Sequence, residues 1–501
     1  MSNEIDFSEF RTQSLKGIVI IYGKILFRVL KATWVLLFLF ITKASKLSSI
    51  NILYFYFGII GILLFILIRS YLVYKNFKFK IDGDSFVLKK GIIAKNNTAI
   101  AFDRIQNVNF SQNVIHQLIN VYQVDIETAG SDKTEISIKA LSLDQAKALR
   151  KKITDGKTQE QSIVEENELV KEKPLLSIGV NDLLKVSITE NHLQSLLLLT
   201  AFLFGFYQQI QDVFQNFIGE EILDNYVNKG KDLLTGSLLL LLGLLIFLSI
   251  VAIISSFVRV FLRHFNLTFS IKNRAFEIQQ GLTNKKAIIL KKEKVQFITI
   301  ITNPLKRRLG ISYVIFKQAI SGKVKKTDKL IKIVGCKKEH LDKIKETLYT
   351  SYDFENVTKE KPHWYFTYRI ILRTTLILLC FNVFFYFIFD GKNQVFVNVF
   401  LLLIIGTLFY KKIRKLFFKV SKDMLLVGGG AIETSSTYLE MFKVQNVKIQ
   451  QSIFQRRRKV ADVILQTASG KIKLPSIKEQ RANELYNHIL YTIETSTKEW
   501  M

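Results

Sequence analysis

Residues 105–129 read IQNVNFSQNVIHQLINVYQVDIETA, and residues 444–468 read VQNVKIQQSIFQRRRKVADVILQTA. A third version, VQFITIITNPLKRRLGISYVIFKQA, occupies residues 295–319. The versions at 295 and at 444 start 190 and 339 positions after the first, and all three align without a gap. A match of this length in three places indicates an internal repeat, so the chain carries three copies of one structural unit.

Each copy alternates apolar and polar residues, as in a β-strand with one buried face. In YQVDIETA, for example, Val124 and Ile126 face one side and Gln123 and Asp125 face the other. A helix-like stretch closes each unit, and two of these stretches open with a capping-box pattern, at Ser142 and at Ser476. We therefore expect small antiparallel β domains, each closed by one C-terminal helix.

Two columns of aligned residues stand out as structural positions of the repeat. A glycine column falls where a hairpin turn is needed, because glycine tolerates positive φ. A glutamine column falls within a predicted strand, where an amide that bonds a loop backbone is favoured over ligand contact. These positions are Gly91, Gly281 and Gly430, and Gln106, Gln296 and Gln445.

Six apolar stretches are candidates for crossing a membrane, which requires about 20 residues each. They form three pairs: 30–47 with 50–72, 193–214 with 235–258, and 370–389 with 394–411. The first stretch is short and basic at one end, so an interfacial helix remains the alternative there. Each pair predicts a transmembrane hairpin that leads into one soluble domain.

The distribution of charge predicts the orientation of these hairpins. The net charge of the chain is +29. Segment 259–373 carries 26 Lys and Arg against 9 Asp and Glu, segment 411–501 carries 17 against 8, and segment 75–192 carries 17 against 16. The tip Phe217–Leu234 carries two lysines against four acids. Because Lys and Arg are enriched on the cytoplasmic side, both termini and all three domains are expected there, with anionic lipid rather than nucleic acid as the partner.

The sequence thus divides into seven segments. We assign residues 1–74 to the N-terminal segment and first hairpin, 75–153 to the first β domain, and 154–192 to an acidic linker with an interfacial lead-in. The second hairpin takes residues 193–261 and the second domain 262–352. A linker and the third hairpin take 353–411, and the third domain takes 412–501.

Residues that carry out catalysis are hard to find. The six histidines are scattered, without metal-ligand spacing, and the predicted spans have almost no charge at their centres. The glycine-rich VGGGAIETSS at Val427 lacks the Lys-Ser/Thr ending of a phosphate loop and coincides with the turn of the repeat. We therefore predict no enzymatic activity, no cofactor and no metal.

Two basic clusters occupy one register position of the repeat, where the first copy has only His116. They are candidate contacts for anionic lipid headgroups or for a protein partner. The alternative is a basic face that only contacts solvent. The clusters consist of Lys306, Arg307 and Arg308, and of Arg456, Arg457, Arg458 and Lys459.

The aligned motif, with each copy behind a two-helix hairpin, resembles bacterial pleckstrin-homology-like (PH-like) membrane proteins of the YdbS/YdbT type, and the triplicated layout is most similar to the YdbT type. This resemblance implies a membrane α-helical plus α+β fold, in which each hairpin precedes a bent antiparallel β domain with a C-terminal helix. It implies no catalytic site. The middle copy departs from the motif, because VQFI replaces IQNV.

The expected function is a multi-pass inner-membrane scaffold or a lipid and protein interaction module. The resemblance links it to envelope stress or antimicrobial-peptide tolerance, and suggests a shorter single-repeat PH-like membrane protein as a partner besides membrane lipids. Two alternatives stay open: a transporter or channel component, and a lipid-modifying membrane enzyme. The oligomeric state is not indicated.

Overall fold

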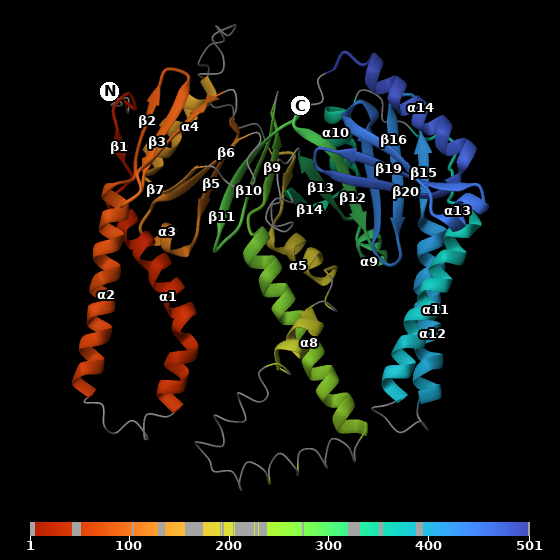
Figure 1. Ribbon diagram of the computed structural model, residues 1–501, viewed down its shortest axis with the longest axis horizontal. Helices are drawn as coiled ribbons and strands as arrows, with labels where there is room; N and C mark the ends of the chain where they lie inside the picture. Colours follow the sequence, from red (N-terminus) through yellow and green to blue (C-terminus); the bar gives the residue numbers. More distant parts are fainter. Residues whose placement is uncertain are drawn as a thin grey trace. The chain divides into compact units, whose positions relative to one another are not determined.

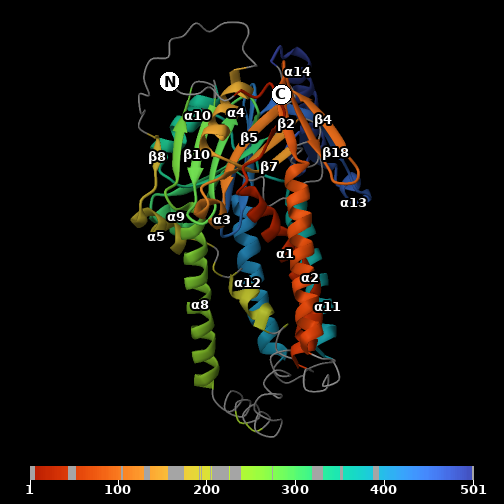
Figure 2. The same cartoon turned by 90° about the vertical axis from the view of Figure 1, so that its left-hand side faces the viewer.

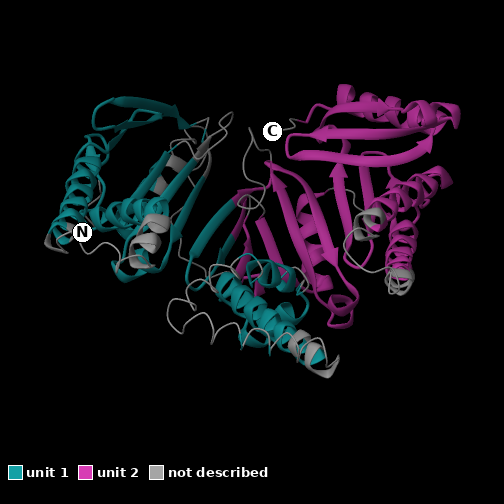
Figure 3. Ribbon diagram, turned by 60° about the horizontal axis from the view of Figure 1, so that its bottom comes forward, with its two compact units in different colours: residues 1–172, 179–267, 278–289 teal, residues 173–178, 268–277, 290–501 magenta. Residues whose placement is uncertain are grey.

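The computed structural model describes residues 6–42, 52–102, 105–128, 136–155, 174–190, 195–203, 238–272, 275–318, 331–349, 354–386 and 394–498, with the single residues 192, 205, 225 and 229 (Figure 1). The chain divides into two compact units (Figure 3). Unit 1 contains residues 1–172, 179–267 and 278–289, and unit 2 contains residues 173–178, 268–277 and 290–501. The division therefore passes through the second repeat.

Long helices occupy the predicted membrane segments wherever the structure describes them. They are α1 (Gly17–Thr42), α2 (Ile52–Lys75), α8 (Leu238–His264), α11 (Trp364–Tyr386) and α12 (Gln394–Lys415). Among the described residues, two stretches are long and apolar enough to cross a membrane, Tyr56–Lys75 and Ile246–His264. Most of the predicted span 193–214, the tip Phe217–Leu234 and the linker 156–173 lie outside the described residues. The three transmembrane hairpins thus stay a prediction, and Figure 2 shows α2 from the side.

The first repeat forms two antiparallel sheets and a helix. The strands β2 (Lys78–Asp82), β3 (Ser85–Lys90) and β4 (Asn96–Ala101) make the first sheet. The strands β5 (Ile105–Gln112), β6 (Tyr122–Thr128) and β7 (Ile136–Leu141) make the second, and α4 (Leu143–Asp155) follows. The predicted inward residues Val124 and Ile126 are fully buried in the core of this domain.

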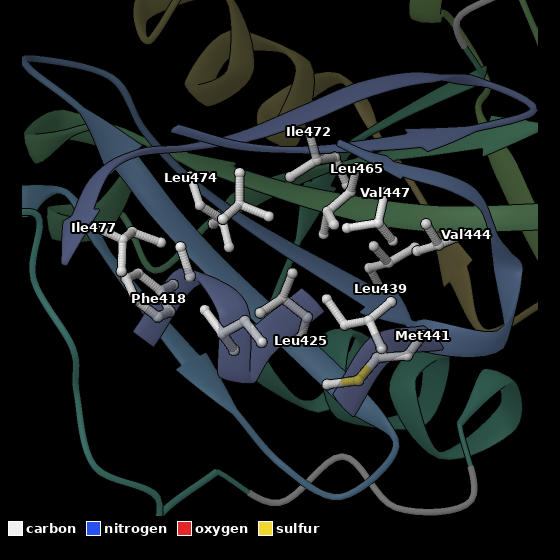
Figure 4. Packing of buried hydrophobic residues seen from close by; sticks show 14 of the residues in the cluster. Phe418, Leu425, Leu439, Met441, Val444, Val447, Leu465, Ile472, Leu474 and Ile477 are labelled. Carbon is white, nitrogen blue, oxygen red and sulfur yellow. The ribbon is translucent and has the colours of Figure 1, made fainter. Parts of the chain in front are cut away.

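The third repeat has the same plan. Its first sheet contains β15 (Phe417–Val420), β16 (Met424–Gly430) and β17 (Thr434–Glu440), and its second contains β18 (Val444–Gln450), β19 (Val460–Thr467) and β20 (Gly470–Lys478). The short 3-10 helix η4 (Met441–Lys443) joins the sheets, and α14 (Glu479–Thr495) closes the domain. Figure 4 shows the apolar core, in which side chains from both sheets, such as Leu425, Leu439, Leu465 and Leu474, meet.

The second repeat supplies β9 (Thr268–Ile271), β10 (Ala275–Gln280), β11 (Lys285–Lys291), β12 (Val295–Thr302), β13 (Ser312–Gln318), β14 (Ile331–Cys336) and α10 (Lys338–Leu348). The helix α5 (Val180–Ile188) precedes it. All strand pairs in the described parts of the chain are antiparallel, which confirms the predicted class of each domain.

Neighbouring repeats join edge to edge, which the sequence did not indicate. In unit 1, β5 of the first repeat pairs with β11 of the second, with Gln112 opposite Lys285. In unit 2, β12 of the second repeat pairs with β17 of the third, with Thr302 opposite Thr434. The second sheets of the first and second repeats therefore continue into the first sheet of the repeat that follows.

A short segment before each helical hairpin pairs with the first strand after it. The strand β1 (Arg11–Thr12) pairs with β2, β8 (Leu176–Ser177) pairs with β9, and Glu360 forms a bridge with Phe418. The positions opposite them, Phe79, Phe269 and Phe418, occupy one register position of the repeat and are buried. The repeat unit thus begins before its hairpin rather than after it.

The two columns of aligned residues have separate structural explanations. The glycines Gly91, Gly281 and Gly430 have φ values of 117°, 106° and 110°, which confirms the predicted turn, and a Cβ there would collide with the carbonyl three residues on. The glutamines fall where the register of β5, β12 and β18 shifts by one residue, so each lies at a β-bulge. Gln296 is fully buried and Gln445 is exposed.

One of the two predicted capping boxes is present and the other is wrong. Ser142 Oγ accepts from the Gln145 N–H, and the Gln145 side chain accepts from the Ser142 N–H, so α4 begins as predicted. Ser476 instead lies within β20 with φ of 48°, and its backbone N–H donates to Asp462. The helix α14 begins three residues later, because the strand pairing of Ile477 and Lys478 extends over the predicted cap.

Candidate functional site

A short helix at one corner of each domain carries the candidate site. The helices α3 (Val114–Leu118), α9 (Pro304–Arg308) and α13 (Ile453–Arg457) follow β5, β12 and β18. Each begins after an N-cap side chain that accepts a hydrogen bond from the backbone N–H three residues on. The caps are Asn113, Asn303 and Ser452, and each helix ends before a residue with positive φ: Asn120, Gly310 or Lys459.

One position of this helix points into the domain in all three copies. It holds His116, Lys306 and Gln455, which are exposed by 1%, 1% and 2%. Burial lowers the pKa of His116, whose ring nitrogens lie 2.5 Å and 2.9 Å from Asn113 Oδ1 and the Lys139 carbonyl. Gln455 donates to Asp462 at 2.9 Å.

The structure places Lys306 apart from the rest of its predicted cluster. Its ammonium group lies 3.1 Å from Glu433 and 3.7 Å from the centre of the Tyr313 ring. A buried, paired cation of this kind is a structural residue rather than a surface contact for a headgroup. Arg307 and Arg308, its neighbours in α9, are exposed.

The helix α13 presents the largest combination of exposed cations and exposed apolar side chains. Ile453 and Phe454 are exposed by 75% and 68%. The four predicted cations beside them, Arg456, Arg457, Arg458 and Lys459, are all exposed. We call this set, Ile453, Phe454 and residues 456–459, the α13 surface. Apolar side chains next to arginines are typical of surfaces that lie at a lipid interface.

The α13 surface lies next to the beginning of α11. The Arg458 guanidinium lies over the ring of Trp364, the first residue of that helix, at 5.4 Å from the ring centre. Trp364 is 54% exposed and contacts the rings of His363 and Tyr365. Aromatic residues of this kind are enriched where a transmembrane helix enters the headgroup layer.

Two tethers fix a domain to the first helix of its own hairpin. In the third repeat, Arg369 of α11 donates to Asp462 at 3.3 Å. In the first, Lys24 of α1 donates to Gln123 at 3.2 Å, and Gln123 occupies the register position of Asp462. The contact thus recurs with different chemistry at one position of the repeat.

Asp462 is the centre of a buried polar network that the sequence analysis missed. Its carboxylate accepts from Gln455 at 2.9 Å, from the Ser476 N–H at 2.7 Å and from Lys473 at 2.8 Å, besides Arg369. Burial raises the pKa of Asp462, but these bonds and the charge of Arg369 outweigh burial and hold the pKa below its ordinary value. An aspartate inside the apolar strand VADVILQT was the available signal.

The described residues hold no group of three His, Cys, Asp or Glu side chains that is arranged to bind a metal. Cys336 is buried, which raises the pKa of its thiol to about 12, and Cys380 is exposed.

Comparison with known proteins matches this architecture. A model of a family described as "Bacterial PH domain" matches residues 25–157, 235–351 and 374–493, that is, each repeat together with part of its hairpin. The transmembrane protein YdbT of Bacillus subtilis (strain 168) is 23% identical over 436 residues, covering 84% of this chain and 85% of that protein.

Proposed function

The chain belongs to the bacterial PH domain family and is a membrane protein with three PH-like domains, and from this premise we propose that it is a non-enzymatic scaffold of the bacterial inner membrane. In this proposal the domains lie on the cytoplasmic face, and their basic short helices bind anionic phospholipid headgroups. The observation that carries it is the α13 surface, where exposed apolar and cationic side chains meet the Trp364 end of α11.

The paired segments at the base of each hairpin support a multi-pass topology. The chain leaves each domain after β1, β8 or Glu360 and returns to the neighbouring strand. A segment whose two ends are joined by backbone hydrogen bonds starts and ends on the same side of a membrane. It therefore crosses an even number of times, as a helical hairpin does, and all three domains share one side. The excess of Lys and Arg in the second and third domains favours the cytoplasmic side.

The polar residues within the third hairpin support a structural rather than a conducting role. Asn398 of α12 donates to Asn382 of α11, so these two amides bond each other across the helix pair. Such pairs stabilise helix association in lipid by about 1 kcal/mol. The proposal for envelope stress or antimicrobial-peptide tolerance rests on the family resemblance alone.

The free energy of attraction between the α13 surface and anionic lipid can be estimated from its residues. Each basic residue near an anionic surface contributes about 1 kcal/mol, and the arginines 456–458 therefore contribute about 3 kcal/mol together. Partial insertion of Ile453 and Phe454 adds about 1 to 2 kcal/mol for each side chain. The electrostatic share weakens as salt rises, whereas the apolar share does not.

The test reconstitutes the full chain in nanodiscs of mixed phosphatidylglycerol and phosphatidylcholine and measures, by mass spectrometry, the lipids that remain bound after mild detergent extraction. The test variant is R456Q/R457Q/R458Q. The matched control, K422Q/K471Q/K498Q, removes three exposed charges elsewhere in the same domain. We expect phosphatidylglycerol enrichment to fall in the arginine variant and to persist in the control. Equal enrichment in wild type and both variants would remove the lipid-binding role.

A further inference from the structure

The two junctions between repeats use the same register. Lys285 and Thr434 are equivalent positions of the repeat, and so are Gln112 and Thr302. Lys285 pairs with Gln112 in the first junction, and Thr434 pairs with Thr302 in the second. Both junctions thus join a strand of the β5 type to a strand of the β11 type with no slip between them. One mode of contact, used twice in one chain, is a property of the repeat itself.

In the first repeat the strand of the β11 type lies at a sheet edge, and in the third repeat the strand of the β5 type does. Among the described residues, β4 pairs only with β3 and β18 pairs only with β19. The strand β4 is the equivalent of β11 and β17, and β18 is the equivalent of β5 and β12. The edge strand β4 is more exposed than β17: Asn96, Asn97 and Ala99 are exposed in β4, whereas all of β17 is buried or half-buried. The chain therefore carries both halves of a third junction.

We infer that β18 of one copy pairs with β4 of a second copy of this chain. The shared register fixes the antiparallel partners: Gln450 lies opposite Asn96, and Val447 lies opposite Ala99. The first pair is equivalent to Ser111 opposite Lys286 in the first junction, and the second pair is equivalent to Ile298 opposite Tyr438 in the second junction. The contact continues the sheet by one repeat and does not depend on lipid binding.

Each junction also has a contact between a short helix and the turn before the partner strand. The equivalents of this helix and this turn lie beside the unpaired edges of β18 and β4. In unit 1, Gln117 of α3 donates to the carbonyls of Leu282 and Thr283, in the turn before β11. In unit 2, Lys306 of α9 reaches Glu433, in the turn before β17. At the free ends the equivalent elements are α13 and the turn 91–95.

The turn before β4 is exposed as expected for a contact that a second copy completes. Ile93 is 97% exposed and Ile92 is 36% exposed. They occupy the positions of Thr283 and Leu282, and Arg456 occupies the position of Gln117. In the proposed junction, Arg456 donates to the carbonyls of this turn and Ile93 is covered by α13.

Lysine at an edge strand often blocks unwanted pairing, but the existing junction accommodates it here. Lys95, the residue before β4, is equivalent to Lys285, which pairs directly with Gln112. A second copy of this chain carries the complementary edge strand and the complementary turn, so it supplies both parts of the junction. Because the two surfaces differ, the contact is heterologous and builds rows or rings of copies rather than a closed pair.

The test is disulfide trapping between two differently tagged full-length chains in native membranes. One chain carries Asn96→Cys and the other carries Gln450→Cys, both in a Cys380→Ser background. Cys336 stays, because burial raises the pKa of its thiol to about 12 and keeps it unreactive. The slip control pairs Asn97→Cys with Gln450→Cys, since a one-residue shift turns the side chain to the other face. The internal control, Ile301→Cys with Ser435→Cys in one chain, uses the equivalent pair of the existing junction.

We expect the internal control to close within one chain, and the Asn96/Gln450 pair to give a product of twice the mass that contains both tags. The slip control is expected to lose that product. Two outcomes would overturn the inference: no two-tag product although the internal control closes, or an equal yield from the slip control. Capture of a smaller protein on either cysteine in place of the second copy would also overturn it.

Discussion

Replacing Asp462 by Asn tests the network that joins the third domain to α11. The substitution is nearly isosteric, so it changes the charge and one acceptor atom without opening a cavity. The amide oxygen retains the bonds from Gln455 and from the Ser476 N–H. The amide NH₂ group, however, then faces the cations of Arg369 and Lys473, which donate to the carboxylate in the native protein.

The expected loss of stability depends on how exposed Arg369 and Lys473, the cationic partners of Asp462, are. Removing one partner of a fully buried ion pair costs about 3 to 5 kcal/mol. The Asp462 side chain is 5% exposed, but those of Arg369 and Lys473 are 34% and 49% exposed, so water compensates part of the loss. We therefore expect about 2 to 3 kcal/mol of destabilisation in the third domain.

Hydrogen exchange of the full chain in nanodiscs measures this loss locally. A loss of 2 to 3 kcal/mol speeds exchange through local opening by about 30- to 150-fold. The acceleration should appear in α13, β19 and β20 and at the start of α11, and should be absent from the first domain. Lys473→Gln, which removes only the more exposed cation, should cost less than about 1 kcal/mol. Unchanged exchange in Asp462→Asn, or equal effects from both variants, would refute the central role of the carboxylate.

Three further predictions follow from the repeat. Gly430→Ala should destabilise the third domain by about 1 to 3 kcal/mol, because φ is 110° and the new Cβ meets the Glu433 carbonyl, and hydrogen exchange of β16 and β17 should show it. The lowered pKa of His116 means that its contribution to stability is complete above the ordinary value of 6.5 and is lost as pH falls below it. Exchange in α3, corrected for intrinsic rates, should therefore rise from pH 7 to pH 5 in wild type but not in His116→Gln. Lys459→Gly should be neutral or stabilise by up to about 1 kcal/mol, because φ is 51°, whereas Arg458→Gly should not stabilise, and denaturant titration of the third domain distinguishes them.

The features that the sequence predicted well are those that depend on local backbone chemistry. The glycine column requires positive φ at one turn, and a single aligned residue reveals that requirement. The alternation around Val124 and Ile126 is likewise local, because period two marks a half-buried strand. The family resemblance, which rests on the same motif, is confirmed by the family model that matches all three repeats.

The features that the sequence missed depend on pairs far apart in the chain. Lys306 reads as one cation of a basic run, and only its contact with Glu433, 127 residues on, shows that it is buried. The predicted cap at Ser476 failed because pairing with β19 holds that residue in a strand. The joining of β12 to β17 has no signal in either strand alone, since any exposed edge presents the same backbone donors and acceptors.

The strand pairs at the base of each hairpin set an order of events during synthesis. Phe7, which precedes β1, is fully buried and packs against Phe79 of β2, with ring centres 6.1 Å apart. The ribosome makes the whole first hairpin between these two residues, which takes roughly 4 to 14 seconds at about 5 to 20 residues per second. The first domain consequently cannot complete its core until both helices have left the ribosome and the chain has returned. In the proposed topology, misinsertion of one helix leaves Phe7 and Phe79 on opposite sides of the membrane, so folding of the domain would report correct insertion of its hairpin.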